Sequence, residues 1–580
     1  MTPRKLRLWH LLTLTTALGA CAGTDTTQQA QDDKEDTFFV GGKADNATGC
    51  SVQGILEWVN AQDTASLYDA GLHRRASNNV GEALGKAAIG SMQQLDDVPY
   101  VGPAALRQIV QAVEDAGLCD EPQVVQAEAI FSPQPIDTSH LARAVELIEG
   151  AQRSVDIAMY SFGYGPLNTA LKQAIRRGVK VRMIFESANK DRANPSNSKS
   201  GALEKIGVDV RYVNKIMHHK FVLIDGPRDE LESAKTGTLM SGSGNWSTSA
   251  AVRYDENAVV VTGSEELNLR YQQEFNHLWH NARDFVAGTP KTFDPGGIAI
   301  TDDMLDTQDD VHAVFTSANF RTYTSSRYGR TFTRVRGMDT VSDEIVARIE
   351  DATFSIKIAS GHMRSRPIAE ALLKKRAEDP SVEIQVYLDG QEYISRWYEG
   401  EQERKTQVCL DEAGTSEAKK EDCLDRGAYY GLALHDAGID VRYKYYSYRW
   451  HYRTAEQMHH KVLLIDGDTL IQGSYNLSSN AEHNTMENMA VFSGGAWSPL
   501  TQAFNDNFDT MWETGRADNL YAGLTATIEQ ATASIPIVFE SMSLTWDEIH
   551  ALKGLIADTC PAIHSAEYRE NPDKKFSCRF

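Results

Sequence analysis

The chain has 580 residues, of which 41% are hydrophobic and 24% are charged, enough apolar material for large buried cores and several domains. Its formal net charge is −22, and without the first 20 residues, which hold three basic residues and no acid, the charge falls to −25. Such an acidic body argues against a general nucleic-acid-binding protein, because affinity for a polyanion requires clustered Lys and Arg.

The first 21 residues have the pattern of an export signal. A basic start is followed by a short apolar run, too short to span a bilayer, and by the sequence LGAC. This ending resembles the bacterial lipobox, in which Cys21 is lipidated and becomes the mature N-terminus; ordinary cleavage beside an incidental cysteine is the alternative. The sequence therefore predicts export to the cell envelope as a membrane-anchored lipoprotein, or else secretion.

The chain has seven cysteines, and six remain once Cys21 is assigned to lipid. An even number of cysteines in an exported chain indicates disulfides, although six cysteines allow 15 pairings. None lies in a CxxC motif, which argues against a zinc or redox role. Because the six fall as neighbours along the sequence, we expect the pairs Cys50–Cys119, Cys409–Cys423 and Cys560–Cys578.

Residues 22–49 are polar and lack periodicity, which predicts a flexible tether. Residues 50–120 instead show apolar residues at spacings of three and four, the pattern of amphipathic helices in a small all-α module. Within this module VPYVGPAAL resembles the turn of a helix-hairpin-helix, although Tyr100 stands where the first glycine usually lies. A structural role and contact with phosphate or nucleic acid both remain open for it.

From residue 125 onward the chain repeats one order of elements. Six segments predict amphipathic helices followed by buried strands, three in each half: 139–162, 168–186, 201–213, 341–360, 368–390 and 431–446. Helices that alternate with β-branched runs predict an α/β sandwich with strands buried beneath helices on both faces. The two halves therefore indicate an internal duplication.

This duplication sets the expected domain boundaries. We place the first repeat at 125–290 and the second at 336–516, joined by a linker at 291–335. A helical tail follows at 517–580, in which Thr545 to Glu548 has the pattern of a capping box.

Each repeat carries the motif His-x-Lys, followed after four further residues by Asp. Downstream lie a Gly-Ser-x-Asn motif and, eleven residues past its Asn, a glutamate. We therefore expect two copies of one half-site, with these members: His218, Lys220, Asp225, Ser243, Asn245 and Glu256 in the first, and His459, Lys461, Asp466, Ser474, Asn476 and Glu487 in the second.

The residue types in these motifs suit phosphate chemistry. His and Lys two residues apart on a strand share a face, so facing repeats would bring two imidazoles, two ammonium groups and two Asn amides into one cleft. Such a cleft suits an anion that gains charge in the transition state, above all a phosphodiester. One imidazole attacks phosphorus and the other protonates the leaving oxygen, while Lys and Asn hold the non-bridging oxygens.

The remaining members are expected to support these groups. Glu256 and Glu487 are placed to accept a hydrogen bond from the other imidazole nitrogen, which fixes the tautomer and basicity of each histidine. Asp225 and Asp466 lie on the opposite strand face and are expected to have a structural role.

Two other interpretations compete with catalysis. A zinc site built from the four motif histidines would place two lysines beside a cation, and no HExxH or cysteine-ligand spacing is present, so we expect no metal and no cofactor. A duplicated scaffold that only binds phosphate ligands would not need intact His, Lys, Asn and Glu twice. His219 and His460 point away from the His-x-Lys face, which predicts buried, hydrogen-bonded histidines.

At these residues the sequence resembles the phospholipase D superfamily, whose hallmark is HxKxxxxD with GSxN, two copies forming one site. The resemblance covers residues 128–516 and implies a metal-independent phosphohistidine mechanism on a pseudo-twofold αβα fold. By analogy His218 is the nucleophile and His459 the general acid, although the two roles could be exchanged. Because one chain holds both motifs, we expect a monomer with no obligate protein partner.

Members of this superfamily cleave phospholipids or nucleic acids, or transfer phosphatidyl groups. Phospholipid hydrolysis, with transfer to alcohols as an accompanying activity, is favoured because lipid at Cys21 would hold the enzyme near headgroups. Tyr and Trp among basic residues at 442–453 also suit a bilayer interface. An exported endonuclease is the alternative, since the segments after GSxN resemble the bacterial nuclease branch and residues 321–336 are basic enough to follow a nucleic-acid backbone. A cardiolipin synthase is disfavoured because the DxRS continuation and membrane spans usual there are absent.

Overall fold

The computed structural model describes these residues: 52–90, 94–95, 97–116, 125–285, 297–305, 310–530, 534–562, 565–570 and 577–579. The chain divides into two compact units, Met1–Gln123 and Val124–Phe580. The expected signal with Cys21, the tether and the pair Cys50–Cys119 lie outside the described residues. Among the described helices, none combines the length and the apolar character needed to cross a membrane.

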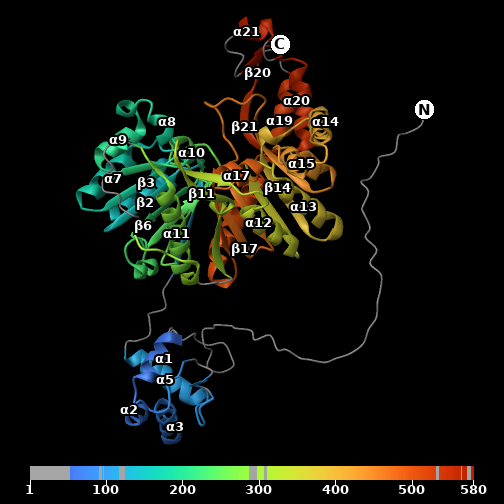
Figure 1. Cartoon of the computed structure of the whole chain (residues 1–580). Coiled ribbons are helices and arrows are strands. Elements are labelled where there is room, and N and C mark those ends of the chain that lie inside the picture. Colours follow the sequence, from blue (N-terminus) through green and yellow to red (C-terminus); the bar gives the residue numbers. More distant parts are fainter. Residues whose placement is uncertain are drawn as a thin grey trace. The chain divides into compact units, whose positions relative to one another are not determined.

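The N-terminal unit is helical in its described part, as the sequence predicts. Its apolar residues form one core beneath four helices, drawn in blue in Figure 1: α1 (Val52–Asn60), α2 (Thr64–Asp69), α3 (Arg74–Leu84) and α5 (Pro103–Asp115). Tyr100, in the turn before α5, has a φ of 69°, in the left-handed region that favours glycine. The backbone therefore makes the turn of the VPYVGPAAL segment without a glycine there, and the helix-hairpin-helix assignment remains a prediction.

The large unit contains two eight-stranded sheets of matching topology. The first sheet is ordered β1-β8-β7-β6-β2-β3-β4-β9, with strands β1 (Gln126–Ser132), β2 (Ser154–Met159), β3 (Lys180–Phe185), β4 (Asp209–Tyr212), β6 (Lys220–Ile224), β7 (Thr238–Gly242), β8 (Glu256–Thr262) and β9 (Arg283–Asp284). The second is ordered β10-β19-β17-β16-β13-β14-β15-β21, with strands β10 (Val311–Phe315), β13 (Ser355–Ser360), β14 (Glu383–Asp389), β15 (Asp440–Ser447), β16 (Lys461–Ile465), β17 (Thr469–Gly473), β19 (Asn488–Phe492) and β21 (Val538–Thr545). In each sheet three strands joined by helices run parallel, β2-β3-β4 and β13-β14-β15, and the other neighbours are antiparallel.

Helices cover both faces of the sheets (Figure 1). The first repeat contributes α6 (His140–Gly150), α7 (Gly165–Arg176), α8 (Ala188–Asp191), α9 (Lys199–Ile206), α10 (Thr248–Val252) and α11 (Glu265–Asn281). The second repeat and the chain after it contribute α12 (Thr340–Asp351), α13 (Arg366–Glu378), α14 (Arg396–Ala413), α15 (Glu417–Leu424), α16 (Gly431–Asp436), α17 (Ser479–Asn484), α18 (Ser498–Trp512), α19 (Leu520–Gln530), α20 (Trp546–Ala557) and α21 (Ala566–Glu570). The mixed α/β fold and the tandem duplication are thus confirmed.

One hydrophobic core is shared by the two repeats. It contains buried residues of both sheets together with the apolar faces of α11 and α18. Each of these helices also contacts the edge strand of the opposite repeat: Phe504 on α18 packs edge-on against Phe131 of β1, and Tyr271 on α11 packs edge-on against Phe315 of β10. This shared core, buried between the repeats, stabilises their association, and each repeat also has a core of its own.

The structure corrects two expected boundaries. The segment 291–335, expected as a linker, supplies β10, which pairs with β19 at the edge of the second sheet, and the hairpin β11 (Phe320–Ser325) and β12 (Gly329–Arg334). The segment 517–580, expected as a helical tail, also supplies β21 to the second sheet and the pair β20 (Ser534–Pro536) and β22 (Ser577–Arg579). These strands were missed because their partners lie far away in the sequence. The capping box at the start of α20 is confirmed.

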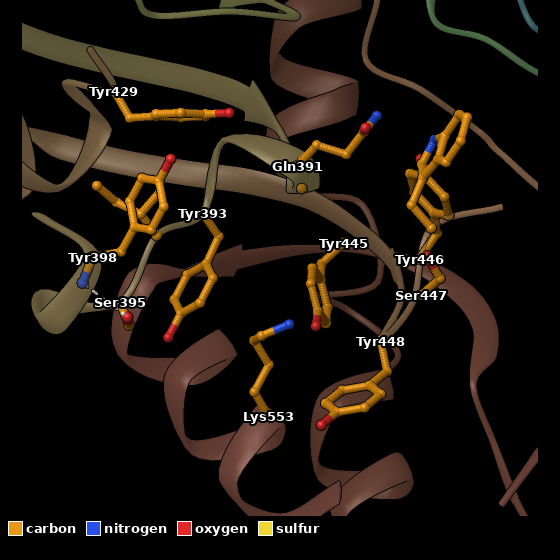
Figure 2. A pocket seen from close by; sticks show the side chains of 13 residues that line it. Gln391, Tyr393, Ser395, Tyr398, Tyr429, Tyr445, Tyr446, Ser447, Tyr448 and Lys553 are labelled. Carbon is orange, nitrogen blue, oxygen red and sulfur yellow. Dashed lines mark hydrogen bonds between the residues drawn. The ribbon is translucent and has the colours of Figure 1, made fainter. Parts of the chain in front are cut away.

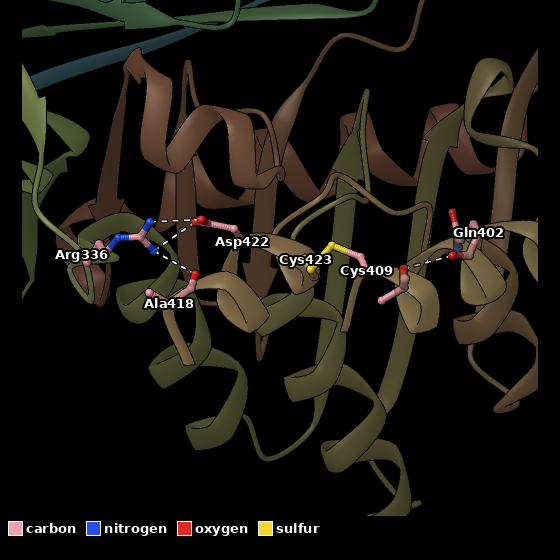
Figure 3. The surroundings of a disulfide bond; sticks show 7 residues. Arg336, Gln402, Cys409, Ala418, Asp422 and Cys423 are labelled. Carbon is pink, nitrogen blue, oxygen red and sulfur yellow. Dashed lines mark hydrogen bonds and ion pairs between the residues drawn. A yellow bond between two sulfur atoms is a disulfide. The ribbon is translucent and has the colours of Figure 1, made fainter. Parts of the chain in front are cut away.

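Two of the expected disulfides, Cys409–Cys423 and Cys560–Cys578, are present. Figure 3 shows the first, which joins α14 to α15 in an excursion of the second repeat. Arg336 fixes this excursion from outside, because its guanidinium donates to both carboxylate oxygens of Asp422, at 3.0 and 3.1 Å, and to the carbonyl oxygen of Ala418. The disulfide therefore links the two helices of the excursion to each other, and the Arg336 ion pair attaches the excursion to the chain before α12.

Candidate active site

The two motif histidines meet glutamates of the opposite repeat. His218 follows the short strand β5 (Ile216–Met217), which pairs with β18 (Thr485–Met486), so the chain just before Glu487 lies beside it. The Nδ1 atom of His218 is 2.8 Å from a carboxylate oxygen of Glu487, and Nδ1 of His459 is 2.8 Å from Glu256. The sequence predicted glutamate partners for the imidazoles. The structure adds that both pairs cross between the repeats, so neither half-site is complete alone.

The two glutamates differ in their surroundings. Glu487 accepts hydrogen bonds from the hydroxyls of Ser474 at 2.7 Å and Thr485 at 2.8 Å. Burial raises the pKa of Glu487, but His218, Lys220 and the Ser474 hydroxyl outweigh it and hold that pKa below its usual value. In Glu256 burial raises the pKa to about 7, although Lys461 and the Ser243 hydroxyl act in the opposite direction. Its buried Oε1 atom has no hydrogen-bond partner among the described residues. The Glu487 carboxylate is therefore ionised over a wider pH range.

The motif lysines are buried, and each one contacts the backbone of its own motif histidine. Lys220 and Lys461 are 3% and 0% exposed, and each Nζ donates to the carbonyl oxygen of its own motif histidine at 2.5 Å. Burial lowers the pKa of Lys220 to about 7 and that of Lys461 to about 8. Among the described residues neither ammonium group has a carboxylate within ion-pairing distance, and a bound phosphate would stabilise their charged form.

Burial also governs the histidines themselves. It lowers the pKa of His218 to about 4, with Glu487 acting in the opposite direction, and it lowers the pKa of His459 well below its usual value. Both imidazoles are therefore neutral near pH 7 in the free protein. With Nδ1 of each ring engaged by a carboxylate, Nε2 is the nitrogen left for chemistry.

The two Gly-Ser-x-Asn segments lie at the ends of β7 and β17 and add the amides. In Asn245 and in Asn476 the side-chain Oδ1 atom is buried without a hydrogen-bond partner. Both glycines are required sterically, since a Cβ at Gly242 or Gly473 would overlap the backbone of the adjacent strand. Ser243 accepts a hydrogen bond from the backbone N–H of Asn257 at 2.9 Å, which ties its loop to the strand that carries Glu256.

The motif aspartates are structural, as the sequence predicts. Asp225 and Asp466 follow β6 and β16 in the left-handed conformation, with φ of 52° and 53°. The Asp225 carboxylate accepts from three consecutive backbone N–H groups, residues 152 to 154, and Asp466 accepts from residues 353 to 355. Each aspartate therefore fixes the entry of the neighbouring central strand and does not face the motif histidine.

The second histidine of each motif is buried and hydrogen-bonded across the repeats. Nδ1 of His219 is 2.8 Å from the amide of Asn488, and Nδ1 of His460 is 2.8 Å from the amide of Asn257. His219 also contacts Glu274 on α11 at 3.2 Å. The sequence predicted their burial; the Asn partners, each one residue past the site glutamate, were missed because contacts between the repeats cannot be read from spacing alone.

The sequence did not predict one further difference between the half-sites, which is the residue that lies beside each motif histidine. The backbone N–H groups of Tyr160 and Gly361 donate to the carbonyls of His219 and His460, so the two residues occupy equivalent positions. The ring of Tyr160 packs edge-on against His218, with centroids 4.7 Å apart, whereas Gly361 places no side chain beside His459. The His218 side chain is 10% exposed and that of His459 is 21% exposed.

A cavity of about 500 Å³ lies on the side of the second repeat and reaches Asn476. Its walls include His362 and Arg364, which both bind the buried carboxylate of Glu392, and Asp425 from the disulfide-bonded excursion. The excursion therefore contributes to the walls beside a motif amide. Across the described ranges, no group of three or more His, Cys, Asp or Glu side chains is arranged to hold a metal ion.

Comparison with known proteins follows the same division into repeats. The family model described as a cardiolipin synthase, phospholipase D-like domain matches residues 144–279 and again 345–512, together more than half of the chain. Mitochondrial cardiolipin hydrolase of Xenopus tropicalis is 32% identical over 163 residues, 28% of this chain and 71% of that protein. The protein of the same name from Danio rerio is 35% identical over 150 residues, 25% of this chain and 60% of that protein.

Solved structures with lower identity also match. Nuc, a phospholipase D family member from Salmonella typhimurium, is 22% identical with a TM-score of 0.23, covering 28% of this chain and 97% of its own. The phosphatidylserine synthase of Haemophilus influenzae is 8% identical with a TM-score of 0.40, covering 66% of this chain and 85% of its own.

Proposed function

This chain belongs to the family of phospholipase D-like domains and is a phosphodiesterase, and from that premise we propose that it hydrolyses the headgroup phosphodiester of phospholipids through a phosphohistidine intermediate. The observation that carries the proposal is the pair of cross-repeat His–Glu contacts at 2.8 Å, which bring both half-sites together around two buried lysines. Its relatives from Xenopus tropicalis and Danio rerio are mitochondrial cardiolipin hydrolases, which supports a lipid substrate.

In the first step, Nε2 of His218 attacks phosphorus and the bond to the headgroup oxygen breaks. His459, protonated on Nε2 when substrate binds, gives its proton to that oxygen, so the headgroup leaves as an alcohol and not as an alkoxide. A bound phosphate raises the pKa of a nearby imidazole because it stabilises the charged ring. The product on the enzyme is a phosphatidyl group bonded to His218.

In the second step, His459 is neutral and takes a proton from water, whose oxygen attacks phosphorus and displaces Nε2 of His218. Phosphatidate leaves and the enzyme is regenerated. Lys220, Lys461 and the amides of Asn245 and Asn476 hold the non-bridging oxygens during both steps. A primary alcohol in place of water gives a transferred phosphatidyl group by the same route.

The assignment of His218 as nucleophile has a structural basis. Its partner Glu487 is held by two hydroxyl donors and keeps its negative charge, and this charge supports the cationic imidazolium of a phosphohistidine. Glu256, beside His459, has a pKa of about 7 and supports a ring that only gains and loses a proton.

A paired assay with EDTA tests this function. One sample holds phosphatidylcholine and phosphatidylethanolamine vesicles with ethanol, and the other holds single- and double-stranded DNA; the His218→Ala variant is the control for both. We expect phosphatidate and phosphatidylethanol from the lipid and intact DNA. Cleaved DNA with untouched lipid would establish the endonuclease alternative and refute lipid hydrolysis.

We also propose that the chain is exported and anchored through Cys21 and acts as a monomer at a membrane surface. A radiolabelled fatty acid should be incorporated into the expressed protein and not into the Cys21→Ala variant. Light scattering of the detergent-purified protein should give the mass of one chain. Unlabelled protein would exclude the anchor, and a dimer mass would exclude the monomer.

A further inference from the structure

A second cavity, of about 530 Å³, lies at the carboxyl ends of β14 and β15 and is shown in Figure 2. It is bounded by the start of α14, by the end of β15 and by Lys553 of α20, and none of the motif residues lines it. Most of its wall is aromatic, formed by Trp450 and six tyrosines: Tyr393, Tyr398, Tyr429, Tyr445, Tyr446 and Tyr448. A cavity of this size is typical of small-ligand sites.

Lys553 is the cation of this cavity. Its Nζ lies over the rings of Tyr448, Tyr393 and Tyr445, at 4.9, 5.5 and 6.0 Å from their centroids (Figure 2). Within the described part of the chain, its ammonium group makes no hydrogen bond and has no carboxylate within ion-pairing distance. Burial and the charge of Arg449 both lower the pKa of Lys553. The aromatic faces stabilise this half-buried ammonium, and an anion in the cavity would add the charge partner that it lacks.

The hydroxyl group of Tyr445 provides a further donor beside Lys553. Within the described residues it is buried without a hydrogen-bond partner, and burial raises its pKa, so this group stays protonated. A neutral phenol with no acceptor can donate to an anion. The cavity thus offers one ammonium and one phenolic donor to a negatively charged group, with aromatic faces around them.

A short segment after β14 connects the cavity to the backbone beside His459. Asp389, the last residue of β14, accepts a hydrogen bond at 2.9 Å from the backbone N–H of Met458, which precedes His459. The next residues, Gly390 and Gln391, line the cavity. A ligand there contacts the same loop that positions the motif histidine.

We propose that this cavity binds the glycerophosphate group of an anionic ligand, with the phosphate on Lys553 and the Tyr445 hydroxyl and the glycerol against the tyrosine rings. Its volume accommodates more than a bare phosphate, and the donors match a phosphate group. The source is either an anionic lipid headgroup or a soluble glycerophosphate. The choice of ligand rests on the proposed function, because glycerophosphate is the part that phospholipids share; the anion site itself does not.

The test measures binding without turnover, so it is separate from the lipid assay. The full-length His218→Ala protein is titrated calorimetrically with sn-glycerol 3-phosphate and, in a second arm, with phosphatidylcholine vesicles containing phosphatidylglycerol. Lys553→Met removes the cation, Lys553→Arg keeps it, and Lys374→Met is the matched control, since Lys374 is an exposed lysine paired with Glu350. Thermal unfolding of each variant verifies folding.

We expect saturable binding in at least one arm, weakened at least about tenfold by Lys553→Met. The Lys553→Arg and Lys374→Met variants should bind as the parent does. The arm that binds identifies the source. No saturable binding in either arm, or equal losses in Lys553→Met and Lys374→Met, overturns the proposal. If Lys553→Met does not fold, Tyr445→Phe, which removes the phenolic donor and keeps the ring, should weaken binding, and unchanged binding in that variant overturns the proposal.

Discussion

The two repeats have the same strand order and the same motif, yet they build unequal half-sites. The carboxylate that crosses to His218 is held by two hydroxyls, whereas the one that crosses to His459 has an oxygen without a partner. A tyrosine ring covers His218, and a glycine stands at the equivalent place beside His459. A duplication therefore supplies two copies of the chemical groups, and in the proposed mechanism the small differences around them distinguish the roles of the two histidines.

The largest expected effect separates the two histidines. His218→Ala and His459→Ala should each lower turnover of a natural phospholipid at least about 10³-fold, because each removes a group that acts in both steps. A substrate with a p-nitrophenolate leaving group needs no acid in the first step. It should restore burst release of p-nitrophenol in His459→Ala and not in His218→Ala; a burst in the His218 variant would reverse the assignment.

The glutamates should respond differently to pH. Glu487→Gln should lower kcat about 10²-fold at every pH between 5 and 9, because the lowered pKa keeps Glu487 ionised there. Glu256→Gln should have little effect below pH 6, where a carboxyl of pKa about 7 is already neutral, and a larger effect at pH 8. Parallel pH profiles for the two variants would contradict the difference between the half-sites.

Stability gives an independent measure of Glu256. Its folded pKa, about 7, lies above the usual value of 4.5, so the stability associated with its neutral form is full below pH 4.5 and is lost as the pH rises through 7. Glu256→Gln should therefore unfold at a higher temperature than the parent at pH 8 and at the same temperature at pH 4. Calorimetry at the two pH values measures this; a lower melting temperature at pH 8 would show that the ionised carboxylate stabilises the fold.

Substitution of Gly361, the glycine beside His459, should reduce activity more than substitution of Tyr160 at the equivalent position beside His218. A Cβ at Gly361 would lie 2.8 Å from the carbonyl oxygen of Met458, next to His459, so Gly361→Ala must displace the histidine. We expect about a tenfold loss of kcat for Gly361→Ala and a smaller loss for Tyr160→Ala, which only uncovers His218. Equal losses in steady-state assays would mean that the two positions are equivalent in function as well as in place.

The smallest effect on activity should come from the excursion of the second repeat. Replacing Cys409 and Cys423 with serine opens a loop with a sequence separation of 14 and should cost about 3 kcal/mol of stability, which thermal unfolding detects. Activity at 25 °C should stay within about twofold, since Arg336 still holds the excursion through Asp422. A large loss of activity would show that the excursion positions the site directly.

The sequence predicted many residues of this site because they lie within the two repeated motifs. The repeated spacing identified the histidines, lysines and amides, and the alternation along each strand indicated the structural role of Asp225 and Asp466. The pairing of His218 with Glu487 could not be predicted, since it depends on how the repeats pack. Tyr160 was missed because it follows β2, which lies beside β6 in the first sheet but far from His218 in the sequence. The strands β10 and β21 were missed because an edge strand is defined by its partner, β19 or β15.

The most direct test of the account is to trap the covalent intermediate. The His459→Ala protein, mixed with the p-nitrophenyl substrate and digested at alkaline pH to preserve phosphoramidates, should yield by mass spectrometry one peptide modified at His218. Modification at another residue, or release of p-nitrophenol with no covalent adduct at any time, would contradict the two-histidine mechanism.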